Sequence, residues 1–210
     1  MRGLSIAGRE VRIGRRDFLA VGAAGAAALL AYGLLREKAG AAPLLRPPGA
    51  QDPDFAARCL RCGECVRACL TKCLEPAPRE FGALELWTPR FNPALGKCEF
   101  ELCGRACAEA CPVRAIRRPP DGEVRIGTAA VNRAKCIAWN EGKACLVCHE
   151  RCSYGAIEPD SRGRPRVIVD KCVGCGACQN TCVTCPDPAI VVYPTEAVPP
   201  EGGGGRKGWG

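Results

Sequence analysis

The sequence predicts a small, loop-rich α+β fold in which short antiparallel strands and short helices surround metal-binding cysteines. Three observations lead to this prediction. The chain has 210 residues and contains 18 cysteines, far above ordinary usage. Aromatic residues make up only 5% of the chain, so large side chains would give a thin core. Short, partly β-branched stretches (RAIRR, GAIEPD and AIVVYP) follow three of the cysteine-rich segments, which indicates an internal repeat.

Residues 1–41 have the pattern of an export leader. Arg15 and Arg16 precede an uncharged, Ala- and Gly-rich run from Phe18 to Leu35, a combination typical of twin-arginine signals. Ala39-Gly40-Ala41 forms an A-x-A site, so we expect cleavage after Ala41. The apolar run borders on the length that spans a bilayer, and the alternative is that it anchors the protein in the membrane.

Composition divides the rest of the chain into three parts. Residues 42–57 are rich in Pro and Gly and are expected to form a linker. Residues 58–193 contain all the cysteines and are expected to form the folded domain. Residues 194–210 lack a periodic pattern of apolar residues and are expected to form a flexible tail. The formal net charge of +8 is mild and scattered, which argues against binding to nucleic acid.

The cysteines fall into four groups with a recurring spacing. In the first and fourth groups, three cysteines are separated by two residues each, and another follows three residues later. In the second and third groups the early intervals are wider. The groups are Cys59, Cys62, Cys65 and Cys69; Cys98, Cys103, Cys107 and Cys111; Cys136, Cys145, Cys148 and Cys152; and Cys172, Cys175, Cys178 and Cys182. Cys73 and Cys185 are additional cysteines.

This spacing is typical of proteins that bind [4Fe–4S] clusters. The cubane needs four thiolates that converge on its iron corners. A compact C-x2-C-x2-C loop supplies three of them, and the fourth cysteine of the run reaches the other cluster of a pair. Gly63, Gly174 and Gly176 suit loops that bend tightly around sulfur. The sequence therefore predicts two ferredoxin-like modules with two clusters each, and four [4Fe–4S] clusters in total.

Disulfides and zinc are the alternative uses of so many cysteines. An exported protein would ordinarily form disulfides, but clustered cysteines with this repeated spacing pair poorly. Structural zinc prefers two C-x2-C pairs, often with His, and His149 is the only histidine of the chain. Cluster assembly in a reducing compartment before export explains why a twin-arginine leader precedes these cysteines. Because metal binding is coupled to folding, we expect the metal-free chain to be largely unfolded.

On these residues the chain resembles the periplasmic ferredoxin-type proteins of the NapG/MauM group. The resemblance covers the leader and residues 59–193. It rests on CLRCGECVRAC, on KCEFELCGRACAEACPVRAI, on IGTAAVNRAKCIAWNEGKACLVCHERC and on CVGCGACQNTC. It implies four [4Fe–4S] clusters, export by the twin-arginine route and electron transfer in the periplasm. It also implies redox partners: a membrane-bound protein that takes electrons from quinol for some members, and a methylamine dehydrogenase system for others.

A similarity to four-cluster electron-transfer subunits further implies that the first group pairs with the fourth and the second with the third. One cluster would bind Cys59, Cys62, Cys65 and Cys182, and its partner Cys172, Cys175, Cys178 and Cys69. The third would bind Cys98, Cys103, Cys107 and Cys152, and the fourth Cys136, Cys145, Cys148 and Cys111. Cys185 is an alternative to Cys182 as a ligand. Otherwise Cys73 and Cys185 are expected to be free thiols or to form a disulfide with each other.

The sequence contains no glycine-rich dinucleotide loop and no arrangement typical of a substrate-transforming site, so we assign no catalytic residue. The predicted function is an exported relay of single electrons between a membrane quinol-oxidising partner and a periplasmic redox enzyme. Two alternatives stay open: a tightly bound iron–sulfur subunit of a larger molybdenum-type oxidoreductase, and a maturation factor for a periplasmic dehydrogenase. His149, beside Cys148, is a candidate donor of a hydrogen bond to a cluster sulfur, although a residue in this position is more often only solvated at the rim of the site.

Overall fold

The computed structural model describes residues 5–6, 9–10, 14–38, 44–120 and 122–199. Contacts between Cα atoms divide the chain into two units, Met1–Ala41 and Ala42–Gly210. The expected Ala39-Gly40-Ala41 cleavage site and most of the expected tail lie outside the described residues.

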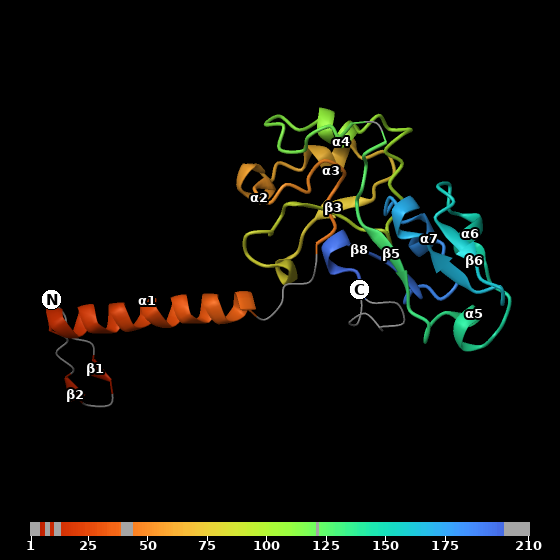
Figure 1. Ribbon diagram of the computed structural model, residues 1–210. Coiled ribbons are helices and arrows are strands. Elements are labelled where there is room, and N and C mark those ends of the chain that lie inside the picture. The colour runs from red at the N-terminus through yellow and green to blue at the C-terminus, as the bar shows by residue number, and fades with distance from the viewer. Residues whose placement is uncertain (1–4, 7–8, 11–13, 39–43, 121, 200–210) are drawn as a thin grey trace. The chain divides into compact units, whose positions relative to one another are not determined.

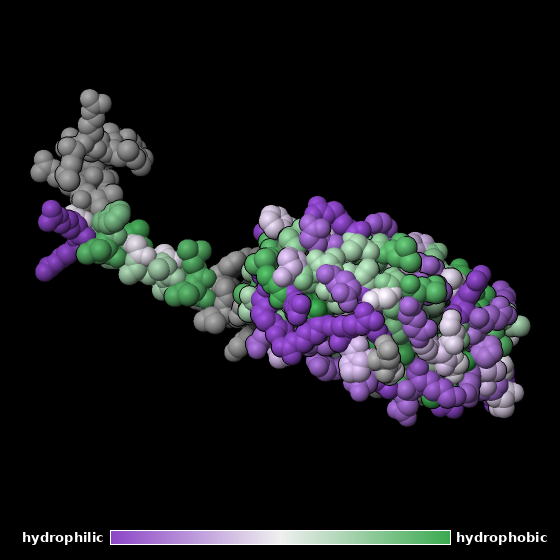
Figure 2. Space-filling model, turned by 90° about the horizontal axis from the view of Figure 1, so that it is seen from above, coloured by the Kyte–Doolittle hydropathy of each residue, from purple (hydrophilic) through white to green (hydrophobic). Residues whose placement is uncertain are grey.

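The first unit consists mainly of one helix. The strands β1 (Ser5–Ile6) and β2 (Arg9–Glu10) pair antiparallel, and α1 spans Arg15–Lys38. Asp17 caps the start of α1, because its carboxylate accepts a 3.0 Å hydrogen bond from the N–H of Gly14. Where Figure 2 colours α1, the helix is largely hydrophobic, with hydrophilic residues at its N-terminal end. Within the described residues, no helix has both the length and the apolar character that a membrane crossing needs.

The helices of the second unit are short, and four of them carry cysteines of the predicted groups. They are α2 (Phe55–Arg58), α3 (Glu64–Ala68), α4 (Ala106–Glu109), α5 (Ile137–Asn140), α6 (Val147–Glu150) and α7 (Ala177–Asn180). Turns of 3₁₀ helix lie at Arg79–Phe81, Val169–Lys171 and Thr195–Ala197. Helices of four or five residues are not stable alone, so contacts outside each helix must hold it in place.

The strands of the second unit form three two-stranded antiparallel sheets. Two sheets are local: β3 (Leu74–Pro76) pairs with β4 (Pro89–Phe91), and β6 (Ile157–Pro159) pairs with β7 (Pro165–Val167). The third joins distant segments, β5 (Thr128–Val131) and β8 (Ile190–Tyr193), which lie side by side in Figure 1. The structure therefore has the short antiparallel strands and short helices that the sequence predicted.

Residues 44–57 belong to the folded unit, so the expectation of a linker over residues 42–57 is wrong for this stretch. The side chains of Leu45 and Phe55 are almost completely buried, at 2% and 1% exposure. The carbonyl oxygen of Leu45 accepts a 2.8 Å hydrogen bond from the N–H of Phe91 at the end of β4. Burial of these apolar side chains and use of the backbone carbonyl outweigh the Pro and Gly content that suggested a linker.

The core of the second unit mixes aliphatic and aromatic side chains with cysteines. Phe91, Ile157 and Val192 are among its most buried members, and Cys65 and Cys178 belong to the same cluster. The cysteine sites are therefore part of the core and are not appended to its surface.

Candidate metal centres

The third cysteine of every group lies in a short helix. Cys65 lies in α3, Cys107 in α4, Cys148 in α6 and Cys178 in α7. The residue before three of these helices has a left-handed backbone: φ is 76° at Gly63, 62° at Arg105 and 81° at Gly176. At Gly176 an added Cβ would lie only 2.9 Å from atoms of Phe91 and Pro93, so glycine is required there. These turns bring the earlier cysteines of a group and the cysteine of the helix to the same cavity.

The fourth cysteine of every group comes where the helix ends. Cys69 is the C-cap residue of α3, and Cys111, Cys152 and Cys182 each follow the C-cap residue of their helix. The chain changes direction at these positions, so each fourth side chain points to a cavity other than that of its own group.

The sixteen predicted ligands line four cavities, and each cavity takes three cysteines from one group and one from a neighbouring group. Site I is lined by Cys59, Cys62, Cys65 and Cys111; site II by Cys98, Cys103, Cys107 and Cys69; site III by Cys136, Cys145, Cys148 and Cys182; and site IV by Cys172, Cys175, Cys178 and Cys152.

The structure groups the fourth cysteines differently from the expected pairing. Cys111, not Cys182, lies with the first group, and Cys69 lies with the second group instead of the fourth. Likewise Cys182 lies with the third group and Cys152 with the fourth. Groups that follow one another along the chain thus exchange their fourth cysteines, which agrees with the tendency of consecutive elements to be neighbours in space.

The two additional cysteines do not line these cavities. Cys185 is exposed, and its sulfur lies 3.7 Å from the carbonyl oxygen of Gln179. Cys73 is fully buried, and its sulfur lies 3.5 Å from that of Cys69. All eighteen cysteines, which lie within the described part of the chain, are free thiols, so the suggested disulfide between Cys73 and Cys185 is not present.

Main-chain amides donate hydrogen bonds to several of the sulfurs. In site I the N–H of Ala115 donates to Cys111 Sγ at 3.2 Å, and in site IV the N–H of Ala156 donates to Cys152 Sγ at 3.2 Å. The donor is four residues beyond the cysteine in both cases. Main-chain donors of this kind hold the sulfur in position beside the cavity that it lines.

Burial and neighbouring sulfurs shift the thiol pKa values within the sites. Burial, together with Cys59 and other nearby sulfurs, raises the pKa of Cys65 to about 11. The same causes raise the pKa values of Cys107 and Cys148 to about 12 each. Burial also opposes ionisation of Cys182, but hydrogen bonds that include one to Thr184 outweigh it and lower its pKa. Four crowded thiolates therefore need a positively charged group among them.

The donor set of each cavity fits a [4Fe–4S] cluster. Each cavity offers four cysteine thiols, the usual ligands of such clusters, and no imidazole lines any of the four. Among the described residues, no three His, Cys, Asp or Glu side chains lie close enough together to hold a single metal ion.

Site I is the most open of the four sites. Its cavity measures ≈ 270 Å³, compared with ≈ 20 Å³ for each of the others. Among the sixteen predicted ligands, all of which lie in the described residues, Cys62 is the only exposed one. Leu60, Trp87 and Val113 line the same cavity and are 63%, 66% and 43% exposed. An apolar rim therefore surrounds the entrance to site I.

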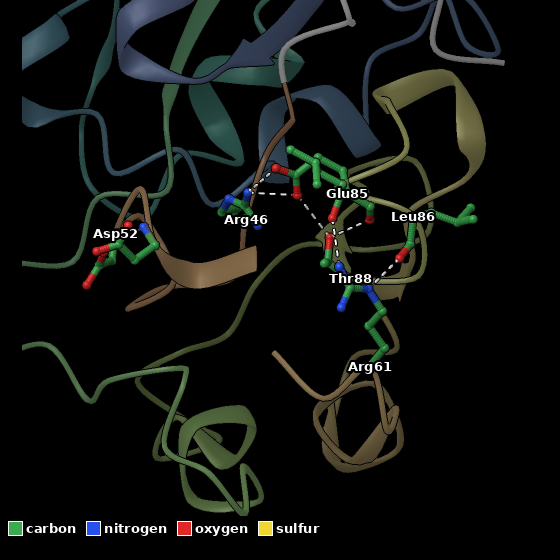
Figure 3. Close-up of polar contacts among 8 residues, drawn as sticks. Arg46, Asp52, Arg61, Glu85, Leu86 and Thr88 are labelled. Atoms are coloured by element: carbon green, nitrogen blue, oxygen red, sulfur yellow. Dashed lines mark hydrogen bonds and ion pairs between the residues drawn. The ribbon is translucent and has the colours of Figure 1, made fainter. Parts of the chain in front are cut away.

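Arg61 fixes the loop that forms part of this rim. Its guanidinium donates hydrogen bonds to the carbonyl oxygens of Leu84 (2.8 Å) and Leu86 (2.9 Å). On the same loop, Glu85 accepts two hydrogen bonds from Arg46, at 2.7 and 2.8 Å. Figure 3 shows how Arg46 and Arg61 approach the loop from different segments of the chain. No spacing in the sequence indicates these contacts, because they join residues 23 to 39 positions apart.

His149 uses its Nδ1 for a contact other than the hydrogen bond to a cluster sulfur that the sequence raised as one possibility. Its Nδ1 makes its hydrogen bond with the carbonyl oxygen of Ile157, at the start of β6. The ring therefore ties α6 to β6, and its neighbour Cys148 remains the residue that faces site III.

Known proteins similar to the chain are ferredoxin-type proteins. The methylamine utilization ferredoxin-type protein MauM of Methylorubrum extorquens is 39% identical over 183 residues, which cover 80% of each chain. The ferredoxin-type protein NapG of Escherichia coli is 36% identical over 219 aligned positions, which cover 93% of each chain. MauM of Paracoccus denitrificans is 33% identical over 192 residues, 82% of this chain and 84% of the relative. No protein-family model and no solved structure matches the chain. Identity at this level over most of its length shows that the chain belongs to the NapG/MauM family of ferredoxin-type, iron–sulfur electron-transfer proteins.

Proposed function

We propose that the protein is exported to the periplasm, where it relays single electrons through four [4Fe–4S] clusters from a membrane quinol-oxidising partner to a periplasmic redox enzyme. One observation carries the proposal: sixteen cysteines line four cavities with four thiols in each. A bound [4Fe–4S] cluster would supply reversible one-electron chemistry. The cysteines hold it, and their surroundings set its reduction potential.

The four sites form two pairs in this proposal, each pair a ferredoxin-like module. Sites I and II share the first two groups, and the sulfurs of Cys65 and Cys69, from these two sites, both raise the pKa of Cys107. Sites III and IV share the last two groups, and the sulfur of Cys148 in site III contributes to the raised pKa of Cys178 in site IV. Sites within a pair are thus close enough to influence one another electrostatically.

Direct contacts then join site II to site IV. The N–H of Cys98 donates a 2.8 Å hydrogen bond to the carbonyl oxygen of Cys175. Nearby, the rings of Phe100 and Tyr154 stack with centroids 6.0 Å apart. The side-chain amide of Asn180 at the end of α7 donates to the carbonyl oxygen of Pro93 at 3.0 Å. These contacts support the order I–II–IV–III along the relay.

Sites I and III are the two ends of this order. Site I has the exposed ligand Cys62 and the apolar rim of Leu60, Trp87 and Val113. Electron transfer between proteins needs close approach, and apolar surface favours transient docking. We therefore assign site I as a station where electrons are exchanged with a redox protein.

Export is supported by the leader. The twin arginines stand at the first two positions of α1, and an Ala- and Gly-rich helix follows them. A protein that acquires its metal before export needs a route that carries folded cargo, which is the route these signals address.

A reductive titration of the anaerobically purified full chain tests the relay. We expect the protein to accept about four electrons reversibly, one per [4Fe–4S] cluster. The Cys111→Ser variant, which loses a ligand of site I, should accept about three, and Cys185→Ser should still accept four. A wild-type protein that accepts no electrons, or accepts them only with irreversible loss of iron, would rule out the relay.

A further inference from the structure

Thr184 makes a close contact with the fourth cysteine of site III. It follows Cys182 by two residues, between α7 and β8. Its Oγ1 lies 3.2 Å from Cys182 Sγ and accepts a 2.8 Å hydrogen bond from the N–H of Ala189. Because the amide of Ala189 supplies the proton of that bond, the hydroxyl keeps its own proton for the sulfur.

Backbone turns hold this hydroxyl in position. The N–H of Cys185 donates to the carbonyl oxygen of Cys182 at 3.1 Å, and the N–H of Asp187 donates to that of Thr184 at 3.1 Å. Two successive turns therefore fix the segment from Cys182 to Asp187, and the geometry of the contact follows from the backbone.

The same contact does not recur at the other fourth cysteines. Thr71 occupies the equivalent position after Cys69, but its hydroxyl is 3.8 Å from Cys69 Sγ and donates to Cys73 Sγ at 3.3 Å. The equivalent positions after Cys111 and Cys152 are Val113 and Tyr154. The structure describes the fourth cysteine of every group. Of these cysteines, Cys182 has the closest side-chain hydroxyl.

We infer that Thr184 is a positioning residue whose hydroxyl donates a hydrogen bond to the Cys182 thiolate and so raises the reduction potential of the cluster that site III would hold. The inference rests on the proposed function, because it requires a cluster in that site. A hydrogen bond to a ligand sulfur withdraws negative charge from it, and this favours the reduced, more negative state. Site III is one end of the order I–II–IV–III, so a raised potential there draws electrons towards that end.

A redox titration followed by EPR, on the anaerobic full chain, tests the inference. Thr184→Val removes the hydroxyl, whereas Thr184→Ser keeps it. Thr181→Val is the matched control. Thr181 immediately precedes Cys182 in the sequence, but its hydroxyl donates to the carbonyl oxygen of Ala177 at 2.8 Å. We expect Thr184→Val to lower the reduction potential of one cluster by up to about 59 mV. For transfer of one electron, this corresponds to a tenfold change in the equilibrium constant for reduction. Thr184→Ser and Thr181→Val should keep the wild-type potentials.

The outcomes separate this inference from the proposed function. Four clusters with unchanged potentials in Thr184→Val would overturn the inference and leave the relay intact. An equal shift in Thr181→Val would also overturn it, since the effect would then be structural. If Thr184→Val loses the iron of site III, Thr184→Ala removes the same hydroxyl with less side-chain bulk and carries the same test. A wild-type protein without clusters would overturn the proposed function itself.

Discussion

The main-chain N–H of Cys98 donates a 2.8 Å hydrogen bond to the carbonyl oxygen of Cys175. Cys98 belongs to the second group and lines site II, and Cys175 belongs to the fourth group and lines site IV. The bond therefore connects the two halves of the cysteine-rich unit at their metal sites. In the proposed relay order I–II–IV–III, site IV is the only direct neighbour of site III.

This order predicts how the reduced clusters interact. Cys178→Ser should remove site IV and leave site III magnetically isolated, so the EPR signal of site III should lose its broadening from spin coupling. Cys65→Ser should remove site I and leave the signal of site III coupled as before. The spectra of the two fully reduced variants make the comparison. Isolation of site III by Cys65→Ser would contradict the order.

The side chain of Arg46 should matter for stability. Its Nη2 donates to both carboxylate oxygens of Glu85 in a partly buried ion pair, and its guanidinium lies 4.7 Å from the ring centroid of Phe55. Arg46→Met should lower stability by about 2 kcal/mol, because it leaves Glu85 without its charged donor. This corresponds to a fall in Tm of about 4–8 °C for a domain of this size.

The exposed ion pair of Arg67 with Glu64 provides the control for this measurement. The Arg67 side chain is 71% exposed, and exposed pairs contribute about 0–1 kcal/mol. The Tm of Arg67→Met should therefore fall by less than about 4 °C when both variants are followed by circular dichroism under anaerobic conditions. Equal losses in the two variants would show that Arg46 has no special role.

Much of each candidate site could be predicted from the sequence, because three of the four cysteines that line each cavity come from one local run. The left-handed turns at Gly63 and Gly176 were likewise suggested by the glycines themselves. The origin of the fourth ligand could not be predicted from spacing, because the side chain of Cys69 or Cys111 leaves its own loop. Which site this side chain reaches depends on how the β3–β4 sheet directs the chain between the first and second cysteine groups. The rule that consecutive elements are neighbours would have favoured the observed exchange.

Other features depend on contacts that no local pattern encodes. Leu45 and Phe55 are buried although the Pro- and Gly-rich sequence around them indicated a linker. The hydrogen bonds of Arg61 to the 84–86 segment depend on a left-handed backbone at Arg61 (φ 56°), which a non-glycine residue adopts only when its surroundings hold it there.

Acid should release metal from the sites. The pKa values of Cys65, Cys107 and Cys148 are raised to about 11, 12 and 12, so without metal these thiols hold their protons at neutral pH. Protons therefore compete with iron for the sulfurs, and each fall in pH favours the proton. We expect visible absorbance and bound iron to fall together as the pH is lowered from 8 to 5. Retention that improves towards pH 5 would contradict this competition.

The twin arginines should be needed for export. Replacement of both Arg15 and Arg16 by Lys keeps the charge but removes the pair that the twin-arginine route reads. The variant should remain in the cytoplasm with its clusters assembled, as measured by cell fractionation and iron content. Arg36→Lys, near the other end of α1, is the matched control and should be exported normally. Normal export of the double variant would show that the leader uses another signal.

The most direct measurement of the central claim is an iron and sulfide analysis of anaerobically purified protein, combined with EPR after reduction. We expect about sixteen iron and sixteen sulfide per chain, with signals typical of [4Fe–4S]⁺ clusters, and a loss of about four of each in Cys111→Ser but not in Cys185→Ser. Colourless protein that contains zinc or disulfides in place of iron and sulfide would contradict it.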